Sequence, residues 1–273
     1  MILSARDLRD TAIGAILLGI MLLPVYWLFV SSLETTPQIF HTPPYLLPPT
    51  PTLASYGTAI STLGRYLVNS FIICAGSVLL SLVLGAPAAF GMAHLRLRVT
   101  ATLALAMLVA QMFPTVMLAT PLFLIFNRFG LVNNYAGLII ADTTVALPFV
   151  LLLLRAFLLT VPYELTEAAL VDGTTYWGAF YRVVLPVAVP GLATAALFAF
   201  LFSWGDFTYG LTLTTDASIQ PISLGLYNFV SQYATDWNDL MAGAILTSLP
   251  AAVLLVGAQR FITAGITAGA VKG

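Results

Sequence analysis

Six long apolar segments constrain the fold of this chain more than any other feature. A helix rises about 1.5 Å per residue, so about 20 apolar residues cross a hydrocarbon core of about 30 Å. The segments of this length are residues 12–32, 67–93, 101–126, 136–158, 187–211 and 241–260. Charged residues make up only 8% of the chain, which excludes a water-soluble globular protein. We therefore predict an all-α polytopic membrane protein, with six transmembrane helices in a single domain over residues 1–273.

The placement of basic residues predicts the orientation of these spans. Six spans leave both termini on one side, and a cytoplasmic N-terminus puts eight basic residues on inner segments against two on outer ones. The inner residues are Arg6, Arg9, Arg96, Arg98, Arg155, Arg182, Arg260 and Lys272, and the outer ones are Arg65 and Arg128. We expect both termini in the cytoplasm and a retained N-terminus, because no small-residue cleavage pattern follows the first apolar segment.

The loops differ in composition. Residues 33–66, the first external loop, contain six prolines between Pro37 and Pro51 and predict an extended tether. Residues 160–186, between the fourth and fifth spans, carry three acidic residues within nine positions: Glu164, Glu167 and Asp172. Because this loop lies on the predicted inner side, its acidic segment should face the cytoplasm.

This inner loop predicts two short helices joined at a glycine. Pro162 and Glu164 suit the first turn of a helix, and Gly173 suits its end. Thr174 or Thr175 can cap the second helix, which should run to Pro186 at the start of the fifth span.

One face of the first helix is a candidate docking surface. Leu165, Ala168, Ala169 and Asp172 fall at positions i, i+3, i+4 and i+7, and the two alanines would let a partner approach closely. The alternative is an amphipathic helix that lies on the bilayer. Such helices normally carry Lys and Arg on the polar face to meet anionic lipid, whereas this one carries carboxylates. A protein partner is therefore favoured.

Polar residues within the apolar segments are candidates for a translocation path, because charge inside a membrane is costly. The candidate residues are Gln111, Asn127, Asp142, Trp204, Asp206 and Tyr209. The two acids have the alternatives of interfacial exposure or of pairing with a helix of a partner subunit. Sugars offer hydroxyl groups and apolar ring faces, which such polar and aromatic groups could contact.

No motif for catalysis or for metal binding is present. The chain has no GxxxxGK[ST] phosphate loop, no Ser, His and Asp set, and no paired carboxylates in one polar region. His41 and His94 are isolated, and Cys74, the single cysteine, cannot form an internal disulfide. We expect no enzyme activity and no nucleic-acid partner.

The inner loop, residues 160–186, also resembles a known sequence motif. Its pattern resembles the EAA motif of binding-protein-dependent ABC transporter permeases, EAAxxDGAxxxxxFxxxxLPxxxP, and departs from it at Thr174, where the family usually has alanine. The matching residues are Glu167, Ala168, Ala169, Asp172, Gly173, Phe180, Leu185, Pro186 and Pro190. Other segments are similar to the carbohydrate branch, the maltose-permease-like subunits: residues 113–139, Asn69-Ser70, residues 204–207, and residues 265–273 of the C-terminal tail 261–273. In residues 204–207 that branch more often has asparagine and glutamate where Gly205 and Asp206 stand.

This resemblance implies a type I ABC importer permease fold with a cytoplasmic coupling helix between the fourth and fifth helices. It implies a bacterial inner-membrane importer of a sugar, with disaccharides, oligosaccharides, glycerol phosphates and other polyols left open. The residues that would couple the chain to an ATPase are Glu164, Glu167, Ala168, Ala169, Asp172, Gly173, Phe180, Leu185 and Pro186.

The implied assembly contains a second permease subunit, two ATPase subunits and an extracytoplasmic solute-binding protein. The two permeases form a heterodimer in the lipid bilayer. ATP and Mg would bind in the ATPase, and this chain would bind no cofactor. Whether the C-terminal tail approaches the ATPase stays open. The alternative function is a self-sufficient secondary transporter or channel for a small polar solute.

Overall fold

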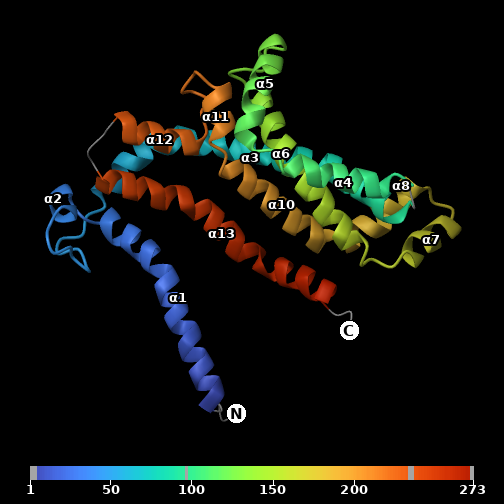
Figure 1. The fold of residues 1–273 in the computed structure, drawn as a ribbon, viewed down its shortest axis with the longest axis horizontal. Coiled ribbons are helices and arrows are strands. Elements are labelled where there is room, and N and C mark those ends of the chain that lie inside the picture. The colour runs from blue at the N-terminus through green and yellow to red at the C-terminus, as the bar shows by residue number, and fades with distance from the viewer. Residues whose placement is uncertain (1–4, 96–97, 233–236, 271–273) are drawn as a thin grey trace. The chain divides into compact units, whose positions relative to one another are not determined.

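The computed structural model describes residues 5–95, 98–232 and 237–270, and the side chains of 9–95, 98–227 and 237–259 (Figure 1). The elements over these described residues are all helices, which confirms the predicted all-α class. In the described part of the chain, four helices are long and apolar enough to cross a membrane, or up to six if each of two bent pairs forms one span. Within the single domain predicted for residues 1–273, contacts define two compact units.

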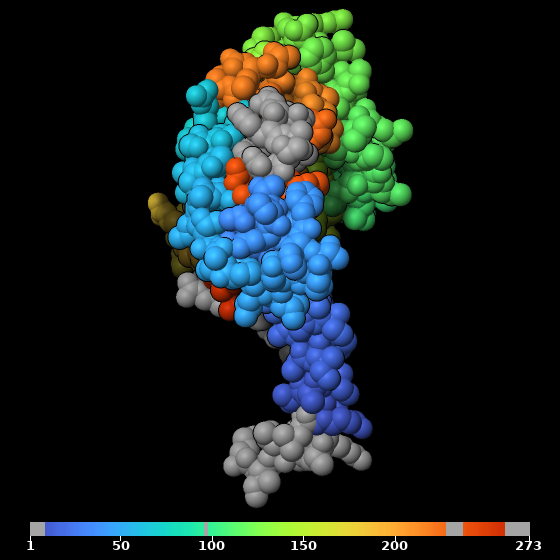
Figure 2. Space-filling view, turned by 90° about the vertical axis from the view of Figure 1, so that its left-hand side faces the viewer, coloured from blue at the N-terminus to red at the C-terminus, as the bar shows by residue number. Residues whose placement is uncertain are grey.

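The first unit comprises residues 1–64 and 226–249. Its first helix, α1 (Ala5–Ser32), contains the predicted span 12–32 and is seen as the dark-blue column of Figure 2. The side chains of α1 between Ile13 and Trp27 are mostly apolar and exposed: Met21, for example, is 76% exposed. An apolar helix that its own chain leaves uncovered is expected where lipid or another subunit supplies the surroundings.

Residues 33–53 of the first unit, the first part of the predicted external loop, contain little regular secondary structure. The helix α2 (Thr36–Ile39) lies within this segment, and residues 41–53 contain no helix or strand. Thr36 donates a hydrogen bond to Asn238 (3.0 Å), and Asn238 donates one to Ser55 (2.8 Å). These bonds join the loop to the beginnings of α3 (Ala54–His94) and α13 (Trp237–Ala270). Residues 54–66, also predicted as part of the loop, belong instead to α3, which begins at Ala54, before the predicted span 67–93.

The second unit comprises residues 65–225 and 250–273. It holds most of α3, which runs without interruption for 41 residues, and the last part of α13. Its other helices are α4 (Thr100–Gln111), α5 (Thr115–Arg128), α6 (Tyr135–Leu158), α7 (Glu164–Val171), α8 (Tyr176–Ala179), the π-helix η1 (Phe180–Val184), α9 (Leu185–Val187), α10 (Val189–Trp204) and α11 (Thr208–Leu213). The helix α12 (Ile222–Gln232) begins in this unit.

Two predicted spans are broken. The segment 101–126 is predicted as one span, but α4 and α5 meet at 97°, with Pro114 in an extended conformation (φ −60°, ψ 131°) between them. A proline disfavours the helical conformation of the residue before it, so the break follows from Pro114. By contrast, α6 covers the predicted span 136–158 as one helix.

The predicted span 187–211 is broken twice. The segment that ends at Val187 meets α10 at 80°, and α10 ends at Trp204, before the separate helix α11. Pro186 and Pro190 flank the first break, and each lacks the N–H that would continue an α-helical hydrogen-bond ladder. In the last predicted span, α13 starts at Trp237 and continues to Ala270, beyond the expected end at residue 260.

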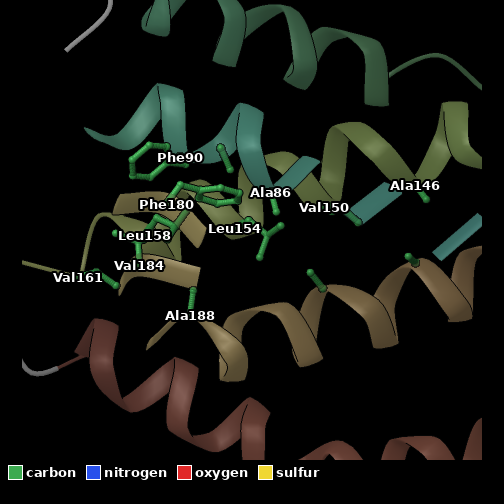
Figure 3. Packing of buried hydrophobic residues seen from close by; sticks show 13 residues of the cluster. Ala86, Phe90, Ala146, Val150, Leu154, Leu158, Val161, Phe180, Val184 and Ala188 are labelled. Atoms are coloured by element: carbon green, nitrogen blue, oxygen red, sulfur yellow. The ribbon is translucent and has the colours of Figure 1, made fainter. Parts of the chain in front are cut away.

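Small residues let three helices of the second unit pack closely (Figure 3). Ala86 of α3, Ala146 of α6 and Ala195 of α10 are buried in one apolar cluster. A Cβ on Gly191 would lie 2.6 Å from the Phe157 ring, so the approach of α10 to α6 requires glycine at this position. Small residues at helix interfaces are typical of membrane proteins, where close packing replaces the hydrophobic effect as the source of stability.

Candidate functional site

The helix α7 and the glycine after it form the first candidate site. Gly173 has φ +83°, a conformation that glycine adopts without the steric cost of a side chain. The Thr174 amide and hydroxyl both donate to the Ala169 carbonyl, at 3.1 and 2.7 Å, and close the end of α7. The Thr175 hydroxyl accepts from the Gly178 amide (3.2 Å) and caps α8. The predicted pair of helices around Gly173 is therefore present, and the departure from the family pattern at Thr174 adds a capping bond.

The two faces of α7 differ sharply in exposure. Thr166 and Ala169 are buried, at 0% and 5% exposed, and hold the helix to its own chain. The exposed face, hereafter the α7 outer face, comprises Glu164, Leu165, Glu167, Ala168, Val171 and Asp172. The prediction that Ala169 contributes to a contact face is wrong, because its methyl group is covered by this chain itself. Leu165, Ala168 and Asp172 remain available to a partner.

The motif residues after α7 lie at different depths. Phe180 is 2% exposed and packs against Phe90 of α3, with ring centroids 5.1 Å apart (Figure 3). Leu185 is half-buried and Pro186 is exposed. Phe180 therefore attaches the loop to the membrane helices from inside the protein, whereas Pro186 lies at the bend before α10.

Two acidic residues line one cavity in the second unit, which forms the second candidate site. The cavity measures about 240 Å³ and is lined by Thr115, Asp142, Val145, Phe202, Gly205, Asp206, Phe207, Thr208 and Tyr209. Asp142 is 4% exposed and accepts a hydrogen bond from Ser203 of α10. The Asp206 carboxylate accepts from the backbone amides of Tyr209 (3.0 Å) and Gly210 (3.1 Å) and so caps α11.

The other predicted path residues are separated from this cavity. Gln111 lines a neighbouring cavity of about 130 Å³, which shares Thr115 and Phe202 with the first. Asn127 is exposed on α5 and lines neither cavity. Trp204 is buried in aromatic packing, with ring centroids 5.2 Å from Phe200 and 5.0 Å from Phe71. The structure thus brings Asp142, Asp206 and Tyr209 together, places Gln111 beside them, and separates Asn127 and Trp204.

Two residues that hold these sites in place were not predicted from the sequence. Ser203 holds Asp142 from another helix, and His94 lies buried beside α7 at 3% exposed. Ser203 sits in an apolar run and His94 at the end of another, so no local pattern marks either of them. Both act through contacts between positions more than 60 apart in the sequence.

Comparisons with known proteins agree with this arrangement. The family described as binding-protein-dependent transport system inner membrane component matches residues 81–268. The trehalose transport system permease protein SugB of Mycobacterium tuberculosis is 38% identical, over 96% of this chain and 96% of its own length. The sulfoquinovosyl glycerol transport system permease protein SmoH of Agrobacterium fabrum is 33% identical, over 99% and 95%.

The fold has a counterpart among solved structures. A chain of a bacterial ABC transporter involved in the import of the acidic polysaccharide alginate superimposes with a TM-score of 0.77 at 21% identity, over 95% of this chain and 99% of that one. The residues that match the family, 81–268, include the segment from α7 to Pro190, which carries the motif. The observed helices agree with the type I permease fold. The chain belongs to the family of inner-membrane components of binding-protein-dependent transport systems, the permeases of ABC importers.

Proposed function

We propose that this chain forms half of the translocation path of an ATP-driven sugar importer and that the α7 outer face docks on a separate ATPase subunit. The main support is the geometry of α7. This helix exposes Glu164, Glu167 and Asp172 to a partner while Thr166 and Ala169 fix it to the permease. A helix held in this way can transmit a rigid-body movement from a partner to the membrane helices.

The proposed assembly contains a second permease subunit, two ATPase subunits and an extracytoplasmic solute-binding protein. ATP and Mg bind in the ATPase, which supplies the free energy of transport. The uneven distribution of Lys and Arg supports a cytoplasmic location for α7 and for both termini, in the inner membrane of a bacterium. To change a two-state pore from one nearly pure state to the other requires about 5.5 kcal/mol of differential binding.

The cavity chemistry supports a neutral sugar as the solute. Asp142 and Asp206 supply hydrogen-bond acceptors for hydroxyl groups, and Phe202 and Phe207 supply apolar surface for a sugar ring. None of the residues that line the two cavities in the described structure is basic. Related permeases are named for trehalose and diacetylchitobiose, which fits a disaccharide or a short oligosaccharide.

The absence of basic residues from the described lining of these two cavities disfavours anionic solutes, including glycerol phosphates. Transfer of an anion from water into a poorly solvated site is costly unless opposite charge or hydrogen-bond donors compensate for the lost hydration. An anionic solute would therefore need compensating positive charge from the second permease subunit.

Reconstitution of the native complex in proteoliposomes tests this proposal. We expect uptake of trehalose, used as a neutral probe with the native solute-binding protein, to depend on ATP at the ATPase side. Asp206→Asn should raise KM about tenfold, because it replaces one acceptor oxygen by an amide donor and the loss of one hydrogen bond from a sugar hydroxyl costs about 1.4 kcal/mol. Asp10→Asn, at an exposed acid of α1, should leave KM unchanged. Uptake without ATPase subunits would indicate the self-sufficient transporter instead, and equal uptake of an acidic disaccharide would contradict charge selection.

A further inference from the structure

We propose that His94 is the positioning residue that fixes α7 to the membrane helices, and that it directs the movement of α7 into α3 and α6. This inference rests on the proposed coupling function of α7. His94 is the last residue of α3 and is 3% exposed. Its Nδ1 lies 2.9 Å from the Thr166 hydroxyl on α7, and its Nε2 lies 3.1 Å from the Leu158 carbonyl oxygen at the end of α6. One imidazole ring therefore joins three helices.

The two contacts assign the proton of the neutral ring. A carbonyl oxygen only accepts, so Nε2 must carry a hydrogen and donate to Leu158. Nδ1 then accepts from the Thr166 hydroxyl, whose residue is fully buried. The Leu158 oxygen also accepts from the Val161 amide (3.1 Å), so His94 occupies its second lone pair. Both nitrogens of the neutral ring therefore have a hydrogen-bond partner. The two bonds fix the direction as well as the distance of the contact between His94 and α7.

Aromatic contacts extend the link on both sides of α7. The His94 ring stacks on Phe90 with centroids 5.2 Å apart, and it lies 5.9 Å from the ring of Tyr163, the residue just before α7. Phe90 in turn packs against Phe180, which follows α8. The end of α3 therefore contacts the chain before α7, within α7 and after α8.

This arrangement changes the expected route of the coupling movement. Pro186 lies at the start of the predicted fifth span, so the simplest route for a movement of α7 would follow the chain through Pro186 into that span. The chain bends by 80° between Val187 and Val189, so it reaches α10 through a break in the helix. His94 instead offers a buried, hydrogen-bonded connection to α3 and α6. A displacement of α7 would thus act first on the second and fourth spans.

Two substitutions remove parts of this link without large changes in volume. His94→Leu removes both hydrogen bonds but keeps an apolar side chain of similar size, and Thr166→Val removes only the hydroxyl. The measurement is hydrogen exchange of residues 164–172 in the purified native complex, together with trehalose uptake per ATP hydrolysed. We expect exchange to rise about five- to tenfold in His94→Leu and less in Thr166→Val, with uptake per ATP reduced about fivefold in His94→Leu.

The other histidine of the chain provides the control. His41 lies in the external loop, where its Nδ1 is 2.7 Å from the Pro43 carbonyl oxygen, and His41→Leu should change neither readout. Unchanged exchange of residues 164–172 in both His94→Leu and Thr166→Val would overturn the link itself. Increased exchange with normal uptake per ATP would overturn its positioning role. Failure of wild-type uptake to require ATP would instead refute the proposed function, and the exchange result would still decide whether the link exists.

Discussion

Reversal of the charges of Glu167 and Asp172 together, by Glu167→Lys and Asp172→Lys, is expected to reduce ATP-driven uptake by about 100-fold. Both side chains lie on the α7 outer face, so the permease itself does not need them for packing. A partner surface complementary to two carboxylates would meet two ammonium groups instead. A loss of about 2.7 kcal/mol of docking free energy, spread over the two positions, corresponds to this factor.

The measurement for this first prediction is the amount of ATPase that copurifies with the permease, alongside uptake in proteoliposomes. Both should fall, while the amount of permease in the membrane stays near the wild-type level. Asp10→Lys reverses an exposed acid of α1 and should leave ATPase association unaltered. If the double variant retains both its ATPase and its uptake, the α7 outer face is not the docking surface.

Replacement of Gly173 by valine is expected to reduce uptake by about 10- to 30-fold. With φ at +83°, Gly173 occupies a region that costs other residues about 1–2 kcal/mol, and β-branched residues suffer most. No atom lies within 4 Å of a Cβ built at this position, so the effect must come from the backbone and not from a collision. The strain would be relieved by a change in the angle between α7 and α8, which displaces the α7 outer face.

Gly173→Asn provides the matched comparison, because asparagine enters the left-handed region more easily than other residues. It should retain most of the uptake that Gly173→Val loses, although asparagine is larger than glycine and polar. The two variants can be compared by uptake and by ATPase copurification in the same membranes. Equal loss in both would point to a requirement for a small residue at a contact surface and would contradict the backbone argument.

Local signals made the two short helices of the loop 160–186 predictable. Proline and acidic residues at a helix start, a glycine at its end and a threonine cap all act within a few residues, so they can be read from the sequence alone. The positions of Gly173 and Thr175 agree with that reading. The orientation of α7 does not follow from such signals, because it depends on which face the remainder of the chain covers. Ala169 for this reason faces inward against expectation.

The candidate path was predictable only as a set of intramembrane polar residues. Pro114 can be recognised in the sequence as a residue that can kink a helix, but hydropathy does not give the angle of 97° at which α4 and α5 meet. The contacts of Asp142 with Ser203 and of His94 with Thr166 join distant segments that share no sequence pattern. These contacts arise from helix packing, which the sequence determines but which no local sequence pattern reveals.

The most direct test of the account is photo-crosslinking from the α7 outer face in the native complex. Val171 is 87% exposed, and Val171→Cys would carry a benzophenone label, whereas the native Cys74 is buried and gives low background. We predict an adduct with an ATPase subunit whose yield changes with ATP, and no such adduct from a label at His41→Cys, an exposed position in the predicted external loop. An adduct of Val171→Cys with the solute-binding protein, or with lipid alone, would contradict the central claim that α7 couples this permease to a cytoplasmic ATPase.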